Sequence, residues 1–229
     1  MSMGGEAGQR GLELGSIAAV AVLELALAAE LWSHVDGPFS AFVLVLASIL
    51  SLPLADFFSG LFHWSADRLL SDRLPVLGPR FVRPFREHHA DPTEMTRHDW
   101  IGTNGNTCAI IAPFLLANWI AVRSLGEHPW GLFFAALIAW TGVWTAATNQ
   151  IHKWAHQPAA PAVVQVLQRR GWILSPAHHA RHHAPPFDRC YCITTGWLDA
   201  WLDRGFFRAL ERLVRPGNRA RAGASGRAG

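Results

Sequence analysis

Four apolar stretches separated by polar connectors constrain the fold of this 229-residue chain most strongly. They cover residues 14–33, 39–62, 107–124 and 130–148. A helix needs about 20 mainly apolar residues to cross the hydrocarbon core of a bilayer. The second and fourth stretches meet that length easily, and the first and third are marginal. The first stretch also resembles a signal peptide, but it has no Ala-x-Ala cleavage pattern. We therefore expect four membrane spans.

The composition agrees with a membrane protein that has a substantial polar part. Hydrophobic residues make up 50% of the chain, and charged residues only 16%, against about 25% in an ordinary globular domain. Three cysteines are too few for a disulfide framework. Disordered, collagen-like and disulfide-stabilised chains are thereby excluded.

The basic residues predict the orientation of the spans. Of the twenty lysines and arginines, all but Arg123 lie before the first span, between the second and third, or after the fourth. Basic residues favour the cytoplasmic side of a membrane. We therefore expect a multi-pass membrane protein with both termini in the cytoplasm.

The remaining segments complete the predicted architecture. We expect a flexible N-terminus over 1–11, one membrane domain over 12–214 and a flexible basic tail over 215–229. Segments 161–170 and 197–214 are amphipathic; the second either lies on the inner leaflet or packs on the domain. The predicted fold is all-α: a four-span helical bundle with a cytoplasmic helical cap.

Histidine is unusually frequent, with 12 residues against a single lysine. Ten of the twelve fall in four patches, all on the predicted cytoplasmic side, and one patch adds a carboxylate. The patches are His63 with Asp67; His88, His89 and His98; His152 and His156; and His178, His179, His182 and His183. We expect these eleven residues to be metal ligands; the alternative for His98 and His178 is to support other ligands or to contact substrate. His34 and His128 stand apart, in the outer connectors.

The spacing within the patches explains why they suit metals. Residues four apart on a helix share one face, so His63 with Asp67, and the pair at 152 and 156, can each hold one ion. Residues 179, 182 and 183 are spaced i, i+3 and i+4, so by the same argument they can hold one ion with three ligands. Neutral imidazole binds zinc, copper, iron and nickel, and a carboxylate shifts the balance toward iron, manganese or zinc. Nine or ten ligands are too many for one tetrahedral zinc, so we expect a dimetal site.

Three polar residues near the patches are candidates for supporting roles. Asp56 lies on the same helical stripe as His63, and we expect it to orient an imidazole through its second ring nitrogen; the alternative is a polar residue beside the Pro53 kink. Lys153 and Arg86 either face lipid phosphate or belong to a solvated surface.

Cys190 and Cys192 are more typical of reduced packing cysteines than of a redox pair.

The ordered patches resemble the histidine boxes of the membrane fatty-acid desaturase and hydroxylase superfamily. The residues in and around these patches are more similar still to the plasmanylethanolamine desaturase family, which comprises the Kua proteins of animals and the CarF proteins of bacteria. The resemblance runs from about residue 50 to 205. It is carried by segments 59–67, 83–89, 91–93, 96–99, 103–105, 148–156 and 192–198. One departure is Phe85, three residues before His88, where the superfamily has a histidine; His98 or another patch would complete that box.

The resemblance implies an activity. Family members desaturate the 1-O-alkyl chain of an ether phospholipid between carbons 1 and 2, which yields the vinyl ether of a plasmalogen. It implies two iron ions, although a purified sample can hold zinc instead, with dioxygen and an external electron donor of the cytochrome b5 or ferredoxin type. Asp99, Asn104 and Asn149 belong to the shared motifs and are expected to support ligands or contact substrate. The Ala- and Arg-rich composition points to a bacterial member of the family, so we expect the inner membrane of a bacterium. Bacterial members are linked to carotenoid synthesis induced by light through singlet oxygen.

Other functions remain open at this stage. The chain has no G-x-G-x-x-G motif, so we expect no nucleotide cofactor of its own, and we expect no nucleic-acid partner. A fatty-acid or sterol-type hydroxylase would use the same scaffold and ligands. A histidine-rich metal transporter would place its ligands near the bilayer midplane. An intramembrane metalloprotease is disfavoured because no H-E-x-x-H occurs.

Overall fold

The computed structural model describes residues 3–214, and every regular element in that range is helical. The four longest helices are α1 (Met3–Ser33), α2 (Pro38–Trp64), α4 (Trp100–Leu125) and α5 (Pro129–His156). Each shares most of its length with a helical segment that is long and apolar enough to cross a membrane. The predicted all-α, four-span architecture is confirmed.

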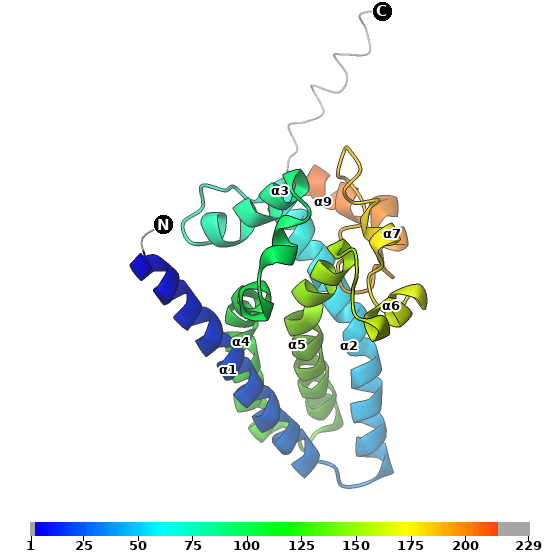
Figure 1. The fold of residues 1–229 in the computed structure, drawn as a ribbon. Helices are drawn as coiled ribbons and strands as arrows, with labels where there is room; N and C mark the ends of the chain where they lie inside the picture. The colour runs from blue at the N-terminus through cyan, green and yellow to red at the C-terminus, as the bar shows by residue number, and fades with distance from the viewer. Residues whose placement is uncertain (1–2, 215–229) are drawn as a thin grey trace, which may run out of the picture.

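The long helices lie side by side in the spatial order α1, α4, α5, α2 (Figure 1). Small and aliphatic side chains fill the contacts between them; Leu27, Ala47, Leu115 and Ala136 are fully buried there. Small residues let helices approach closely in a membrane, where van der Waals packing supplies much of the association energy. Large apolar side chains such as Leu25, Ile49 and Ile120 point outward instead. The bundle surface is therefore suited to lipid.

Short elements form a cap at the end of the bundle where α2 and α5 finish (Figure 1). In chain order they are the π-helical turns η1 (Ser65–Leu69) and η2 (Gly78–Val82), α3 (Arg83–Ala90), the 3-10 turn η3 (Glu94–Arg97), α6 (Ala162–Arg169), α7 (Pro176–His179), α8 (Asp199–Trp201), the π-helical turn η4 (Leu202–Phe206) and α9 (Phe207–Val214). The loops that join α1 to α2 and α4 to α5 lie at the opposite end. Because α2 and α5 run into the cap, their last turns carry side chains directly into it.

Several helix boundaries differ from the prediction. α1 begins at Met3, so residues 3–11 are helical where a flexible N-terminus was expected. α4 begins at Trp100, because Asp99 caps its first turn by accepting a hydrogen bond from Gly102 N at 2.8 Å. Arg10 of α1 donates to the same carboxylate at 2.9 Å, which ties the start of α1 to the start of α4. The tail predicted over 215–229 lies outside the described residues.

Residues 197–214 are not one continuous helix. α8, η4 and α9 follow one another, with a break at Gly205, whose φ of 178° is extended. Leu202 and Phe207 are buried against Trp64 at the end of α2, whereas Trp201 and Leu213 are 71% and 77% exposed. One face of this segment therefore packs on the domain, and the other carries exposed apolar side chains.

Candidate metal centre

Nine of the eleven predicted ligands converge in two groups. The five-histidine group contains His88, His152, His156, His179 and His183, and the aspartate group contains His63, Asp67, His89 and His182. In each group, one ligand atom of every residue lies within 4.8 Å of the corresponding atoms of all the others. Each group therefore has the dimensions of a binding site for one metal ion.

The five-histidine group brings ring nitrogens into direct opposition. Nε2 of His152 lies 2.8 Å from Nε2 of His179, and Nε2 of His88 lies 2.9 Å from Nε2 of His156. Burial lowers the pKa of His88 to about 2 and that of His183 to about 3. These imidazoles are thus neutral at physiological pH, which is the form that binds a metal ion. A cation at the shared centre would satisfy the lone pairs that the rings aim at one another.

The aspartate group surrounds a buried carboxylate. Asp67 Oδ2 lies 3.5 Å from Nε2 of each of its three histidine neighbours, His63, His89 and His182. Both Asp67 oxygens, and His63 Nε2, are buried without a hydrogen-bond partner in the described part of the chain. A buried carboxylate without a partner is costly, so the site fits a cation. Three imidazoles and one carboxylate are a donor set for iron, manganese or zinc.

Helix geometry explains why neighbouring histidines join different groups. Successive residues on an α-helix point about 100° apart, since one turn holds 3.6 residues. His88 and His89 on α3 therefore serve the two groups separately. Likewise, His179 and His183 enter the five-histidine group, and His182 enters the aspartate group. The prediction that residues 179, 182 and 183 hold one ion together is wrong, whereas pairs four apart do share a group.

A π-helical turn at the end of α2 carries Asp67. Leu70 N donates to Ser65 O at 2.8 Å across this turn. Arg86 from α3 donates to the carbonyls of Ala66 at 3.3 Å and Leu70 at 2.6 Å. Arg86 therefore stabilises the turn that supplies the aspartate while remaining exposed, and its predicted contact with lipid phosphate stays a prediction.

Backbone carbonyls orient two rings of the aspartate group. His182 Nδ1 donates to Arg189 O at 2.7 Å, and His63 Nδ1 donates to Tyr191 O at 3.1 Å. With Nδ1 protonated, each ring presents the lone pair of Nε2 to the group, which is how ligand orientation is usually controlled. The sequence analysis missed these two residues, because every residue has a carbonyl and side-chain patterns do not reveal which ones are used.

Asp56 supports this arrangement indirectly. It is fully buried and accepts hydrogen bonds from Thr195 N at 2.6 Å and Gly196 N at 3.0 Å. Nearby, Ser59 Oγ accepts from Ile193 N at 3.1 Å. Within the described residues, the predicted contact between Asp56 and an imidazole is not made. Asp56 instead holds Thr195 and Gly196 against α2; these residues follow the two orienting carbonyls in the sequence.

Two predicted ligands lie outside both groups. His178 Nε2 is 2.7 Å from Asp199 Oδ2. Asp199 Oδ1 also accepts from Cys192 N at 2.9 Å, so the pair holds the same segment. Burial raises the pKa of the Cys190 thiol beside them to about 12, so the thiol stays protonated and is a poor metal ligand. His98 is 47% exposed and pairs with Glu94 at 2.6 Å.

The other predicted supporting residues connect α4 with neighbouring turns. Asn149 on α5 donates to Thr107 Oγ1 at 2.8 Å. Asn104 donates to Trp100 O at 2.8 Å within α4, and Lys153 Nζ donates to the carbonyl of His98. Asn149 also lines the cavity described next. The contacts of Asn149 and Lys153 hold the start of α4 and the residue before its cap against the last turns of α5.

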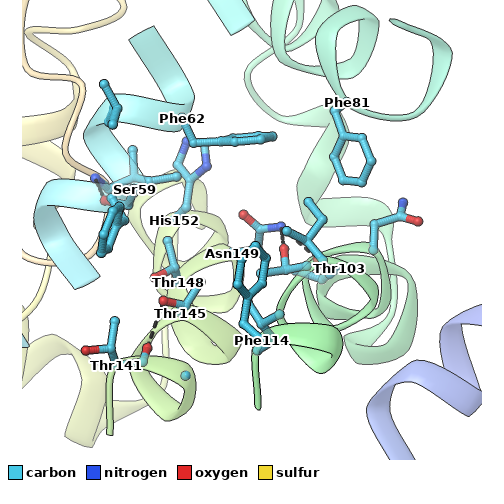
Figure 2. A pocket seen from close by; sticks show the side chains of 18 of the residues that line it. Ser59, Phe62, Phe81, Thr103, Phe114, Thr141, Thr145, Thr148, Asn149 and His152 are labelled. Atoms are coloured by element: carbon cyan, nitrogen blue, oxygen red, sulfur yellow. Dashed lines mark hydrogen bonds between the residues drawn. The ribbon is translucent and has the colours of Figure 1, made fainter. Parts of the chain in front are cut away.

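An elongated cavity of about 950 Å³ runs between α2, α4 and α5 and reaches the five-histidine group at His88 and His152. Figure 2 shows His152, Phe62 and Phe114 around it. Gly102 and Asn118 both line the cavity, and they lie about 24 Å apart along α4 at about 1.5 Å per residue. The cavity therefore extends deep into the membrane-spanning part of the bundle.

Most hydroxyl groups on the cavity wall donate to backbone carbonyls. Ser59 Oγ donates to Asp56 O, Thr145 Oγ1 to Thr141 O and Thr148 Oγ1 to Trp144 O, at 2.8–3.0 Å. The rest of the wall is largely aliphatic and aromatic. The volume lies within the range of pockets that bind small molecules. The cavity thus suits an apolar chain whose end is to be held beside a metal ion.

Comparison with known proteins identifies the family. A model of the lipid desaturase domain matches residues 52–225. The chain is 42% identical over 207 residues to the plasmanylethanolamine desaturase of Myxococcus xanthus, covering 90% of this chain and 72% of the relative. The chain belongs to the plasmanylethanolamine desaturase family. The predicted family is thereby confirmed, and the enzyme is an oxidoreductase of the lipid desaturase class.

Two further relatives are also named as desaturases. Plasmanylethanolamine desaturase 1 of Mus musculus is 41% identical over 191 residues, which are 80% of this chain and 67% of the relative. Fatty acid desaturase 4, a chloroplastic protein of Arabidopsis thaliana, is 30% identical over 171 residues, which are 73% of this chain and 50% of that protein. No solved structure matches the chain.

Proposed function

We propose that the enzyme desaturates the 1-O-alkyl chain of plasmanylethanolamine between carbons 1 and 2, which converts the alkyl ether into a vinyl ether. The observation that carries this proposal is the apolar cavity that reaches His88 and His152. It is supported by the Myxococcus xanthus and Mus musculus relatives, both named as plasmanylethanolamine desaturases. A chain that occupies the cavity brings its terminal carbons beside the five-histidine group.

The two groups would hold one iron ion each. Two irons, when bound, supply the dioxygen chemistry that removes hydrogen from an unactivated carbon. The protein contributes orientation and exclusion of water. Carbonyls of Arg189 and Tyr191 hold two imidazoles in the ligating orientation. The aromatic wall around Phe62 and Phe85 shields the end of the cavity.

The electron balance requires an external donor. The substrate loses two hydrogens with two electrons, the donor supplies two more electrons, and with two protons they reduce dioxygen to two molecules of water. The sequence carries no dinucleotide motif, so the donor is a separate protein of the cytochrome b5 or ferredoxin type. The arginine distribution supports an orientation in which the cap, the metal centre and both termini face the cytoplasm. A link to light-induced carotenoid synthesis stays a prediction from the family.

The decisive experiment supplies an alkyl ether phospholipid to the purified, iron-loaded enzyme with a reductant and dioxygen. We expect a product that has lost two hydrogens by mass spectrometry and that releases an aldehyde in mild acid, because vinyl ethers are acid-labile. A product that has gained one oxygen would instead establish the hydroxylase alternative. A lipid left unchanged by an iron-loaded, reduced enzyme would contradict both.

A further inference from the structure

The proposed function determines where the lipid headgroup must lie. Carbon 1 of the alkyl chain is bonded to the ether oxygen on glycerol, and carbon 2 is bonded to carbon 1, so the phosphate is only a few bonds from the reacting carbons. With these carbons at His88 and His152, the rest of the alkyl chain extends along the cavity toward Asn118. The glycerol and headgroup then lie toward the opposite rim of the cavity, on the side of the cap.

That rim carries two polar side chains that the metal groups do not use. Glu94, Met95 and His98 line the cavity there. Among the cavity-lining residues, all within the described part of the chain, Glu94 is the one carboxylate. His98 is the one lining imidazole that belongs to neither metal group. The rim therefore presents one anionic group and one hydrogen-bonding ring.

The backbone of this rim is held at a short distance from the metal ligands. Lys153 follows His152 directly on α5, and its Nζ donates to the carbonyl of His98. One lysine side chain thus spans the gap between the turn that carries His152 and the rim. Thr96 Oγ1 in η3 donates to the carbonyl of Thr93, the residue just before η3, at 2.6 Å. A subsite here is both close to the metal centre and rigid.

The side chains at the rim are free to exchange partners. Glu94 Oε1 and His98 Nε2 are 2.6 Å apart, but their side chains are 51% and 47% exposed, and an exposed pair contributes little to stability. Arg97 does not compete for Glu94, because it pairs with Asp91 at 2.6 Å. A zwitterionic ligand can therefore replace the internal pair at little cost.

We propose that Glu94 and His98 form the headgroup subsite of the enzyme and recognise phosphoethanolamine. The Glu94 carboxylate accepts hydrogen bonds from the primary ammonium group, and the His98 ring donates to the phosphate. A quaternary choline headgroup has no N–H donor to offer Glu94, so the carboxylate discriminates between the two headgroups. This inference rests on the proposed function and assigns its substrate specificity to two residues.

The test compares E94Q with the unaltered enzyme on two alkyl ether lipids that differ only in an ethanolamine or a choline headgroup. We expect the unaltered enzyme to prefer ethanolamine. In E94Q, KM for the ethanolamine lipid should rise about tenfold, the size expected for one hydrogen bond to a charged group, with kcat unchanged. H98A should raise KM for both lipids, since the phosphate is common to them. E87Q is the matched control, because Glu87 is exposed on α3 and does not line the cavity.

The outcomes separate the subsite from the proposed function. Vinyl ether formation by E94Q with an unchanged ethanolamine preference overturns the subsite and leaves the proposed function intact. Equal use of both lipids by the unaltered enzyme also overturns the subsite. Absence of vinyl ether from either lipid with the unaltered enzyme contradicts the proposed function itself. If E94Q is inactive, metal content and E94D decide: a loss of bound metal overturns the subsite, and ethanolamine preference in metal-replete E94D supports it.

Discussion

Single residues in the cap are assigned to metal groups by their direction as well as by their type. His88 and His89 are adjacent in sequence, yet one faces the five-histidine group and the other faces Asp67. Substitution of either one should therefore remove ligands from only one site. The two substitutions make a matched pair, because they alter neighbouring positions on the same short helix.

We expect H88A and H89A each to abolish activity and to reduce bound iron from about two ions per chain to about one. H63A, H156A and H183A should be inactive for the same reason, with membrane insertion intact. H98A should keep both ions, because His98 lies outside the two groups. Anaerobic metal analysis of the purified variants measures this. Full metal content in H88A or H89A would remove that residue from the ligand set.

The buried imidazoles also predict how pH affects the metal-free protein. Burial lowers the pKa of His88 to about 2 and of His183 to about 3, whereas both titrate near 6.5 in the unfolded chain. As pH falls below about 6.5, the unfolded chain binds protons that the folded chain cannot, so stability decreases. The unfolding temperature of the metal-free protein should fall between pH 7 and pH 5. A higher unfolding temperature at pH 5 would contradict this.

At the scale of elements, the centre depends on how closely the segment around residues 189–199 approaches α2. A Cβ placed on Gly60 would lie 2.6 Å from Cys192 Sγ, so only glycine leaves room there. Asp56, one turn earlier on α2, fastens the same segment through backbone N–H groups. The approach matters because the carbonyls just before Cys192 orient His63 and His182.

We expect Gly60→Ala to lower the free energy of unfolding by about 1–3 kcal/mol, the usual cost of overpacking, and to reduce activity by displacing those carbonyls. Gly15→Ala on α1 is the control, since nothing lies within 4 Å of a Cβ there, and alanine also favours a helix. Thermal unfolding and vinyl ether formation measure the two effects. Equal behaviour of the two variants would show that the approach of the segment to α2 is unimportant.

At the scale of the whole molecule, three long helices and the cap together define the length of the cavity. α2, α4 and α5 supply its walls, and Ala121 lines its deep end. The distance from the metal centre to the deep end of the cavity therefore limits the length of alkyl chain that fits. Because the reacting carbons lie at the start of the alkyl chain, the whole remaining chain must fit between the metal centre and the deep end.

Ala121→Trp should therefore shorten the cavity and lower activity on long alkyl chains more than on short ones. Ala19→Trp on α1 is the matched control, because Ala19 is exposed on the bundle and does not line the cavity. Competition between ether lipids of two chain lengths, followed by mass spectrometry of the products, measures the ratio. An unchanged ratio in Ala121→Trp would show that the chain does not reach the deep end.

Much of the fold and of the candidate site is predictable from local patterns. Apolar runs of membrane length predict the four spans, and helical spacing predicts that His63 joins Asp67 and that His152 joins His156. These features depend only on residues near each other in sequence. The extension of α4 to Trp100 depends on the Asp99 cap, and the extension of α5 to His156 passes through polar residues, so hydropathy misses both.

The sequence by itself determined the helical class, the number of spans, the family and nine residues that now lie in two compact groups, because hydropathy and side-chain chemistry are local properties. The tertiary structure alone decided how those residues divide between the groups, that His98 and His178 lie apart, and that Asp56 holds backbone. It also decided which carbonyls orient the imidazoles. These outcomes depend on the directions of side chains and on contacts between segments more than 100 residues apart, such as Asp56 and Thr195.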